Sequence, residues 1–196
     1  MKLIVITGGP GAGKTALLDI LGKTLCTHSI ILPESASILF KGGFWRLPSN
    51  SSKTCAQRAI FSIQKEQELL VKSEARWQVG YCDRGTLDGL AYWPGTEKSF
   101  FKELQTSRIQ EFKKYSLILH MGCPSVARGY NNSNPIRLET AEEAHLIDEK
   151  IGKIWSQHPH YFHIPSSMNF LTKVKKALTV LKKFQIHNCG DLSNPQ

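Results

Sequence analysis

The 196-residue chain lacks several patterns that would each assign it to a different class of protein. No apolar run approaches the ~18 residues that a membrane-spanning helix needs, so we expect no transmembrane segment. Met1 and Lys2 lead directly into a short apolar run, so we expect no signal peptide. The five cysteines show no C-x-x-C pair or Cys/His ligand spacing, which argues against a zinc site and favours reduced thiols in a cytoplasmic protein. No internal repeat or long linker is present, so residues 1–196 are expected to form one domain.

Acidic residues are comparatively few. The chain has 25 Lys and Arg against 16 Asp and Glu, a formal net charge of +9. This balance fits anionic ligands such as nucleotides, and also a polyanion or an acidic membrane surface. Because aromatic and basic residues do not interleave, we expect no DNA or RNA partner. Part of the charge is expected on the solvated face of a C-terminal helix, at Lys173, Lys175, Lys176, Lys182 and Lys183.

One motif near the amino terminus is highly specific. The pattern G-x-x-x-x-G-K-[ST], the phosphate loop, occurs as Gly8-Gly9-Pro10-Gly11-Ala12-Gly13-Lys14-Thr15. An apolar strand-like run precedes it and a helical pattern beginning at Ala16 follows, as this motif requires. The glycines let backbone N–H groups turn toward phosphate oxygens, and the helix start attracts the same anion. We therefore expect residues 8–16 to bind the phosphates, with Lys14 at the β/γ-phosphates and Thr15 on Mg²⁺.

A second interpretation of the same residues stays open. Gly11, Gly13 and Ala16 also satisfy the looser dinucleotide fingerprint G-x-G-x-x-G/A, and Glu34 lies near its expected acidic position. That fingerprint, however, needs its first glycine directly after the strand and has no use for Lys14 and Thr15. The phosphate-loop interpretation is therefore favoured.

Hydrophobic periodicity predicts alternating strands and helices. Strands are expected at residues 2–7, 29–32, 79–82, 117–120 and 161–164. Helices are expected at residues 14–26, 54–77, 86–92, 97–113, 136–155 and 168–183. Such alternation implies right-handed crossovers and a parallel sheet covered on both faces, an α/β fold with three layers. A loop-like polar segment is expected to form a short lid around 124–140, and the tail from about 187 is expected to fray.

Several candidate site residues follow predicted strands, where ligands bind in such folds. Asp83 ends the third strand and can hold a Mg²⁺ shell or polarise an attacking hydroxyl. Its neighbour Arg84 can bind a phosphate or an acceptor, or pair with a carboxylate. Glu34 ends the second strand and is expected to bind or deprotonate an acceptor hydroxyl. Asp88, one helical turn beyond Arg84, is expected to lie on the surface or to hydrogen-bond locally.

Further candidates come from the lid and the long helix. Arg128 and Arg137 flank the polar segment, and arginines of this kind can neutralise the charge that develops in phosphoryl transfer. Gln64 lies on the predicted helix 54–77, where it can read a polar edge of the acceptor; a solvent-facing position is the alternative.

These motifs together resemble one small family. The resemblance rests on the phosphate loop, Leu32-Pro33-Glu34, Cys82-Asp83-Arg84-Gly85 with Asp88, Ala91-Tyr92, and Ile136-Arg137-Leu138-Glu139 with Glu143-Ala144. The chain is similar to the AAA-type ATPase/kinase domain also found as the nicotinamide-ribonucleoside kinase part of NadR-like proteins, and more broadly to P-loop nucleoside and nucleotide kinases. The resemblance implies a P-loop NTPase fold with five parallel strands and the phosphate-loop strand in the centre. It also implies ATP with Mg²⁺ on Lys14 and Thr15, a Glu34 that contacts the acceptor hydroxyl, an acidic-Arg pair at Asp83 and Arg84, and lid arginines at Arg128 and Arg137.

Two functions follow as hypotheses. The first is a Mg²⁺-dependent kinase that transfers the γ-phosphoryl group of ATP to a small-molecule acceptor, a nucleoside or nucleotide-like compound. The second is a nucleotide-dependent switch or slow NTPase acting through a protein or lipid partner. The absence of an [NT]-K-x-D motif disfavours a GTPase, and no apolar strand ends in Asp-Glu as in AAA machines. The acceptor and the oligomeric state are not specified by any motif.

Overall fold

A five-stranded parallel sheet forms the centre of the computed structural model, which describes residues 1–123, 140–166 and 169–184. Its strands are β1 (Lys2–Thr7), β2 (Ser29–Leu32), β3 (Val79–Asp83), β4 (Leu117–Met121) and β5 (Tyr161–Ile164). Their order is β2-β3-β1-β4-β5, and every neighbouring pair is parallel. This confirms the predicted five-stranded parallel sheet with the phosphate-loop strand at its centre. Since all carboxyl ends meet at one edge, the loops that follow the strands share that edge.

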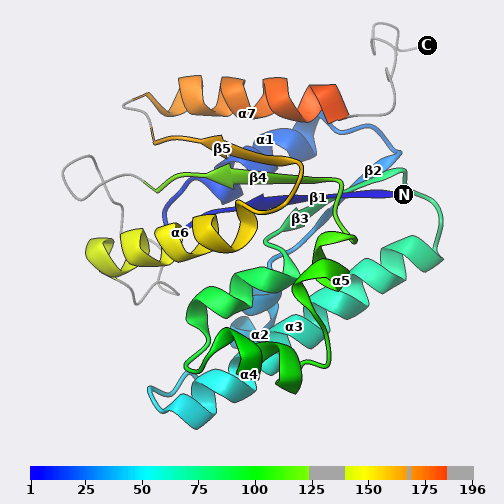
Figure 1. Cartoon of the computed structure of the whole chain (residues 1–196). Coiled ribbons are helices and arrows are strands. Elements are labelled where there is room, and N and C mark those ends of the chain that lie inside the picture. The colour runs from blue at the N-terminus through cyan, green and yellow to red at the C-terminus, as the bar shows by residue number, and fades with distance from the viewer. Residues whose placement is uncertain (124–139, 167–168, 185–196) are drawn as a thin grey trace, which may run out of the picture.

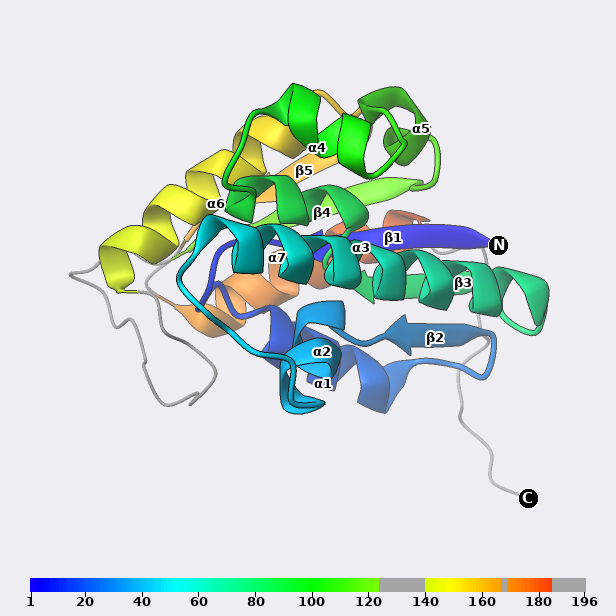
Figure 2. The same ribbon diagram turned by 90° about the horizontal axis from the view of Figure 1, so that it is seen from below.

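Helices cover both faces of the sheet and make it the middle of three layers (Figures 1 and 2). The described helices are α1 (Lys14–Thr24), α2 (Ser35–Lys41), α3 (Asn50–Ser73), α4 (Glu97–Glu103), α5 (Arg108–Phe112), α6 (Ala141–Trp155) and α7 (Phe170–Phe184), with a 3₁₀ segment η1 (Thr86–Tyr92). In Figure 1, α1 and α7 lie on one face of the sheet, and α3, α5 and α6 lie on the other. In the described part of the chain, no helix is long and apolar enough to cross a membrane.

The side-chain alternation of β1 divides the apolar interior into two cores. Ile4 and Ile6 point into the core shared with α1 and α7, whereas Leu3 and Val5 point into the core shared with α3 and α6. All four are 0% exposed. A strand that is apolar on both faces is typical of the centre of a parallel sheet. β1 therefore anchors both layers and holds the phosphate loop directly at its carboxyl end.

Two of the predicted helices differ from the observed ones. The segment predicted as one helix, 97–113, forms two helices, α4 and α5. The chain turns between them at Gln105, whose φ is 50°. Ser107 then caps the start of α5 by accepting a hydrogen bond from the Gln110 N–H. The predicted helix 86–92 is the 3₁₀ segment η1, which contains Gly89.

Helices α2 and α3 also differ from the prediction. The sequence analysis assigned no element to residues 35–40, which form most of α2. The long helix α3 begins at Asn50 and ends at Ser73, four residues earlier at each end than predicted. Ser49 fixes its start by accepting a hydrogen bond from the Ser52 N–H, and Ala75, with a φ of 52°, follows its end.

The basic helix α7 has one lysine that contradicts the prediction. Lys175, Lys176, Lys182 and Lys183 are exposed, as expected of a solvated face. Lys173, in contrast, is 5% exposed, and its ammonium donates hydrogen bonds to the Ala12 and Gly122 carbonyls. Burial lowers the pKa of Lys173. The prediction failed because Lys173 lies on the core-facing side of the helix, beside Val174 and Ala177.

Candidate functional site

The phosphate loop, residues Gly8–Thr15, has a positive φ at three glycines: Gly8, Gly11 and Gly13. Gly8 has a φ of 140°, and a Cβ there would lie 2.2 Å from the Met121 carbonyl oxygen. Gly13 has a φ of 90° and caps the start of α1 without a side chain. The first N–H groups of α1 therefore face the loop with the positive end of the helix dipole behind them. This arrangement is suited to binding an anion.

A cavity of about 940 Å³ opens beside the loop. It is lined by the loop residues Pro10, Gly11, Lys14 and Thr15, and by the predicted site residues Glu34, Gln64, Asp83 and Arg84. The structure thus brings the candidates from β1, β2, β3 and α3 to one place. Arg128, Arg137 and residues 124–139 of the lid predicted around 124–140 lie outside the described residues.

Lys14, which is buried, and Asp83, which is half-buried, both lie in the wall of this cavity. The Lys14 ammonium donates hydrogen bonds to the Gly8 carbonyl at 2.9 Å and the Gly9 carbonyl at 3.0 Å. Burial, helped by the charge of Arg84, lowers the pKa of Lys14 to about 8. Burial raises the pKa of Asp83 to about 6, although the charge of Lys14 opposes that rise. Both groups therefore titrate near neutral pH, which is common at functional sites.

One carboxylate oxygen of Asp83 is available to bind a ligand. Its Oδ1 atom is buried and has no hydrogen-bond partner among the described residues. Buried polar atoms are normally paired, so an orphaned carboxylate oxygen fits a cation or a ligand hydroxyl. Thr15, which lines the same cavity, adds a hydroxyl. Hydroxyl and carboxylate oxygens suit Mg²⁺, which usually keeps few protein ligands and takes the rest of its shell from phosphates and water.

Arg84 is the centre of a buried ion network. Its Nε donates to Glu34 at 2.6 Å, and its Nη1 donates to Asp88 and to the Gly8 carbonyl, each at 3.1 Å. Burial alone would raise the pKa of Glu34, but Arg84 and Lys14 outweigh it and hold the pKa at about 2. The second oxygen of Glu34 accepts a hydrogen bond from Ser37. Glu34 is therefore a fixed anion with both oxygens occupied.

Gln64 lies in the cavity wall and not on a solvent face; it is 3% exposed. Its Oε1 accepts a hydrogen bond from Ser35 at 2.9 Å, and its Nε2 donates to Glu68 at 3.0 Å. Glu68 also accepts from Tyr115 at 2.6 Å. These contacts fix the Gln64 amide in the cavity wall, beside Ser35, the residue that follows Glu34.

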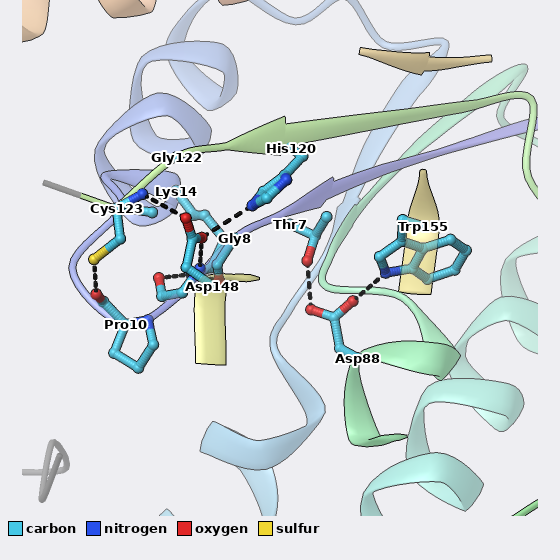
Figure 3. A network of polar contacts seen from close by, with 12 residues as sticks. Thr7, Gly8, Pro10, Lys14, Asp88, His120, Gly122, Cys123, Asp148 and Trp155 are labelled. Carbon is cyan, nitrogen blue, oxygen red and sulfur yellow. Dashed lines mark hydrogen bonds and ion pairs between the residues drawn. The ribbon is translucent and has the colours of Figure 1, made fainter. Parts of the chain in front are cut away.

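Asp88 is one of two buried carboxylates that the sequence analysis did not assign to the site. It is 3% exposed, which contradicts a surface position. It accepts hydrogen bonds from Thr7 at 2.6 Å and from the Trp155 indole at 2.7 Å, in addition to Arg84 (Figure 3). Asp88 therefore ties β1 and α6 to the Arg84 network. Its position four residues after Arg84 is the sequence signal that indicates this pairing.

Asp148 on α6 is the second buried carboxylate that was not predicted as part of the site, and it holds the phosphate loop (Figure 3). Its Oδ1 accepts from the Gly9 N–H at 2.6 Å and pairs with the His120 ring at 2.9 Å; its Oδ2 accepts from the Cys123 N–H at 2.9 Å. Burial alone would raise the pKa of Asp148, but His120 and the two N–H donors hold it at about 2. The signal was available in the sequence, since Asp148 shares the core-facing spacing of Ala144, Ile151 and Trp155.

Comparison with known proteins assigns the family. A family model described as an AAA domain matches residues 3–170. The chain belongs to this AAA domain family. No curated protein matches the sequence.

Solved structures with the same fold include a deoxyadenosine kinase. The M. mycoides deoxyadenosine kinase with bound dATP is 13% identical, with a TM-score of 0.58, over 93% of this chain and 100% of that one. The same kinase with the products dCMP and a flexible dCDP is 12% identical, with a TM-score of 0.57, over 92% and 99% of the two chains. At these identities the likeness supports the P-loop NTPase fold that the motifs predicted.

Proposed function

We propose that this AAA domain protein is a Mg²⁺-dependent kinase that transfers the γ-phosphoryl group of ATP to a small-molecule acceptor. The observation that carries the proposal is the extent of the cavity beside Glu34. It continues from the phosphate loop past Asp83 to Gln64 on α3, so it has room for an acceptor next to a nucleotide. A nucleotide switch that acts through a partner needs no such second compartment. The solved structures with this fold, a deoxyadenosine kinase with nucleotides, support the same class of acceptor: a nucleoside or nucleotide-like compound.

The residues divide into phosphate-binding and acceptor-side groups. The N–H groups of residues 8–16 and the Lys14 ammonium bind the phosphates of ATP, and Lys14 stabilises the charge that develops on the transferred group. Thr15 would hold Mg²⁺, which would neutralise part of the phosphate charge when bound, and the Asp83 carboxylate is left for the acceptor hydroxyl. Arg84 stays beside the transferred group because Glu34 and Asp88 hold it there. Arg128 and Arg137 are proposed to add positive charge from the segment that follows Cys123.

Asp83 is better suited than Glu34 to take the proton of the acceptor hydroxyl. A general base works best with a pKa near the working pH. The pKa of Asp83 is about 6, whereas the ion pair with Arg84 holds that of Glu34 at about 2. We therefore assign Glu34 to orienting Arg84 and the acceptor, and Asp83 to proton transfer.

Turnover with an acceptor panel tests the proposed function. ATP consumption with Mg²⁺ is measured alone and with nucleosides, nucleoside monophosphates and nicotinamide riboside, and the phosphorylated product is identified by mass spectrometry. We expect consumption that depends on one acceptor class and yields one phosphorylated product. Slow hydrolysis that is indifferent to every acceptor contradicts the kinase assignment and favours the nucleotide switch.

The pH dependence of transfer is expected to be bell-shaped. The kcat/KM for ATP reports the titration of the free enzyme. It should rise with pH as Asp83 ionises around pH 6, and fall as Lys14 loses its proton around pH 8. Initial rates between pH 5 and pH 9 check this. The Asp83→Asn variant should keep the alkaline fall and lose the acidic rise; an unchanged acidic limb in that variant would assign the rise to another group.

A further inference from the structure

One wall of the cavity comes from a stretch of chain without any acidic residue. Between Ser35 and Lys65 the sequence contains no Asp or Glu. The same stretch contains five basic residues: Lys41, Arg46, Lys53, Arg58 and Lys65. It forms α2, the connection after it, and the first two thirds of α3. This stretch therefore carries five positive charges and no negative one.

Two of these cations line the cavity itself. Arg46 and Lys53 are both part of its wall. The Arg46 guanidinium lies over the Phe40 ring, 5.1 Å from its centroid, a contact that favours one position of the long side chain. Lys53 is exposed at the mouth of the cavity, and no carboxylate pairs with it in the described part of the chain. This end of the cavity thus presents positive charge to whatever enters.

Four carboxylates line the cavity: Glu34, Asp83 and Asp88, and also Glu143, which lies on α6 with the cavity residue Lys150. Glu34, Asp83 and Asp88 lie at the carboxyl edge of the sheet beside Lys14 and Arg84. Gln64 marks this edge on α3, since it contacts the residue after Glu34. Lys53 precedes Gln64 by eleven residues, which is about 16 Å along a helix. The reaction centre therefore combines carboxylates with the cations that neutralise them, whereas Lys53 adds a cation well removed from it.

Four aromatic side chains also line the cavity. They are Phe40, Phe61, Tyr92 and Trp93. The Trp93 indole donates a hydrogen bond to Ser99 at 2.9 Å and packs edge-to-face on Phe100, so its ring is held in place. Fixed aromatic walls favour a planar ring system in the ligand.

We propose that the acceptor is an anionic ring compound, with the hydroxyl to be phosphorylated at one end and a carboxylate or phosphate at the other. The hydroxyl meets Asp83 and Glu34, the ring lies among the aromatic side chains, and the anionic group reaches Arg46 and Lys53. Transfer forms the bond between the acceptor oxygen and the γ-phosphorus, breaks the bond to the β-phosphate oxygen of ATP, and passes the hydroxyl proton to Asp83. The proposal rests on the proposed kinase function and names its substrate class.

Matched pairs of ribosides that differ by one charge provide the test. Orotidine is uridine with a ring carboxylate, and nicotinate riboside is nicotinamide riboside with a carboxylate in place of the amide. Binding of each is measured by tryptophan fluorescence in the presence of Mg²⁺ and a non-hydrolysable ATP analogue. We expect the carboxylate member of a pair to bind about 10-fold more tightly, as a charge-assisted contact with two cations allows.

Variants identify the cations responsible. Lys53→Met, on an exposed helix position, and Arg46→Met should each reduce the preference for the carboxylate member and leave the affinity for the ATP analogue unchanged. Arg58→Met is the matched control, because Arg58 belongs to the same acid-free stretch but pairs with Glu103 at 3.8 Å and does not line the cavity. It should keep the full preference.

Three outcomes overturn the proposal: equal affinity for both members of each pair, binding of neither member, or a preference that survives in both variants. Weaker binding of the ATP analogue in Lys53→Met would instead assign this cation to the nucleotide. Failure of the kinase assignment looks different. In that case the carboxylate preference persists in the binding experiment, but no member of either pair yields a phosphorylated product when ATP replaces the analogue.

Discussion

Replacing Lys14 with methionine is expected to reduce acceptor-dependent phosphoryl transfer by about 10²- to 10³-fold, the range found when one strong electrostatic contact to a transition state is removed. The ammonium is 7% exposed and sits between the Gly8 and Gly9 carbonyls, at the start of the helix that faces the anion. Methionine has similar length without the charge. The phosphates would then keep the backbone N–H groups but lose the cation beside the transferred group.

The fold of the Lys14→Met variant should survive. Two carbonyls lose a donor, at about 1 kcal/mol or somewhat more each. The variant also removes the cost of burying a charge, which is the cost that lowers the pKa of Lys14 to about 8. The measurements are single-turnover transfer and thermal unfolding, with Lys23→Met, an exposed lysine of the same helix, as control. Transfer within a few-fold of the unmodified protein would show that Lys14 is not at the reacting phosphates.

The parts of the fold that follow from short local patterns could be predicted from the sequence. The strand 2–7, the glycines of the phosphate loop and the start of α1 at Lys14 are all determined within about 20 consecutive residues. The alternation of apolar runs was enough to predict five parallel strands. The end of a helix depends on single residues instead. The turn at Gln105, which divides the predicted helix 97–113, contains no glycine or proline, so the sequence did not indicate it.

Residues whose role depends on long-range contacts were harder to predict. Asp148 contacts Gly9 across 139 positions, and Lys173 contacts Ala12 across 161. Lysine and aspartate are usually solvated, and the general preference for exposure favours a surface position for both. The helix spacing did place them on core-facing sides, beside Val174 and Ile151 respectively. A charged residue at a core-facing position of a predicted helix therefore indicates a buried charge with a partner elsewhere in the fold.

The two buried charges hold the phosphate loop from opposite sides. Asp148 on α6 accepts from the Gly9 N–H, and Lys173 on α7 donates to the Ala12 carbonyl. The loop needs this support because glycine-rich backbone is costly to order. We therefore expect nucleotide affinity to depend on a residue that does not face the cavity.

The Asp148→Asn variant tests this with almost no change of shape. The Gly9 N–H donates to one carboxylate oxygen of Asp148 and the Cys123 N–H donates to the other. In either orientation, the amide NH₂ of the asparagine therefore faces one of these two N–H groups. We expect a loss of about 2–4 kcal/mol in the free energy of unfolding and about 10-fold weaker ATP binding. Urea unfolding and titration with a fluorescent ATP analogue measure the two quantities. Glu149→Gln is the matched control: Glu149 is the next residue along α6, half-exposed, and pairs with His145 at 3.5 Å.

The pH dependence of this stability difference distinguishes a charge effect from a packing effect. The folded pKa of Asp148 is about 2, below its ordinary value of 3.8, so the ionised carboxylate stabilises the fold above about pH 4. That contribution is lost as pH falls through 4 toward 2, and the difference between the unmodified protein and Asp148→Asn should shrink over the same interval. A constant difference would assign the loss to packing. An ATP affinity equal to that of the Glu149→Gln control would show that the loop keeps its form without Asp148, because the helix dipole and the loop glycines would then suffice to order it.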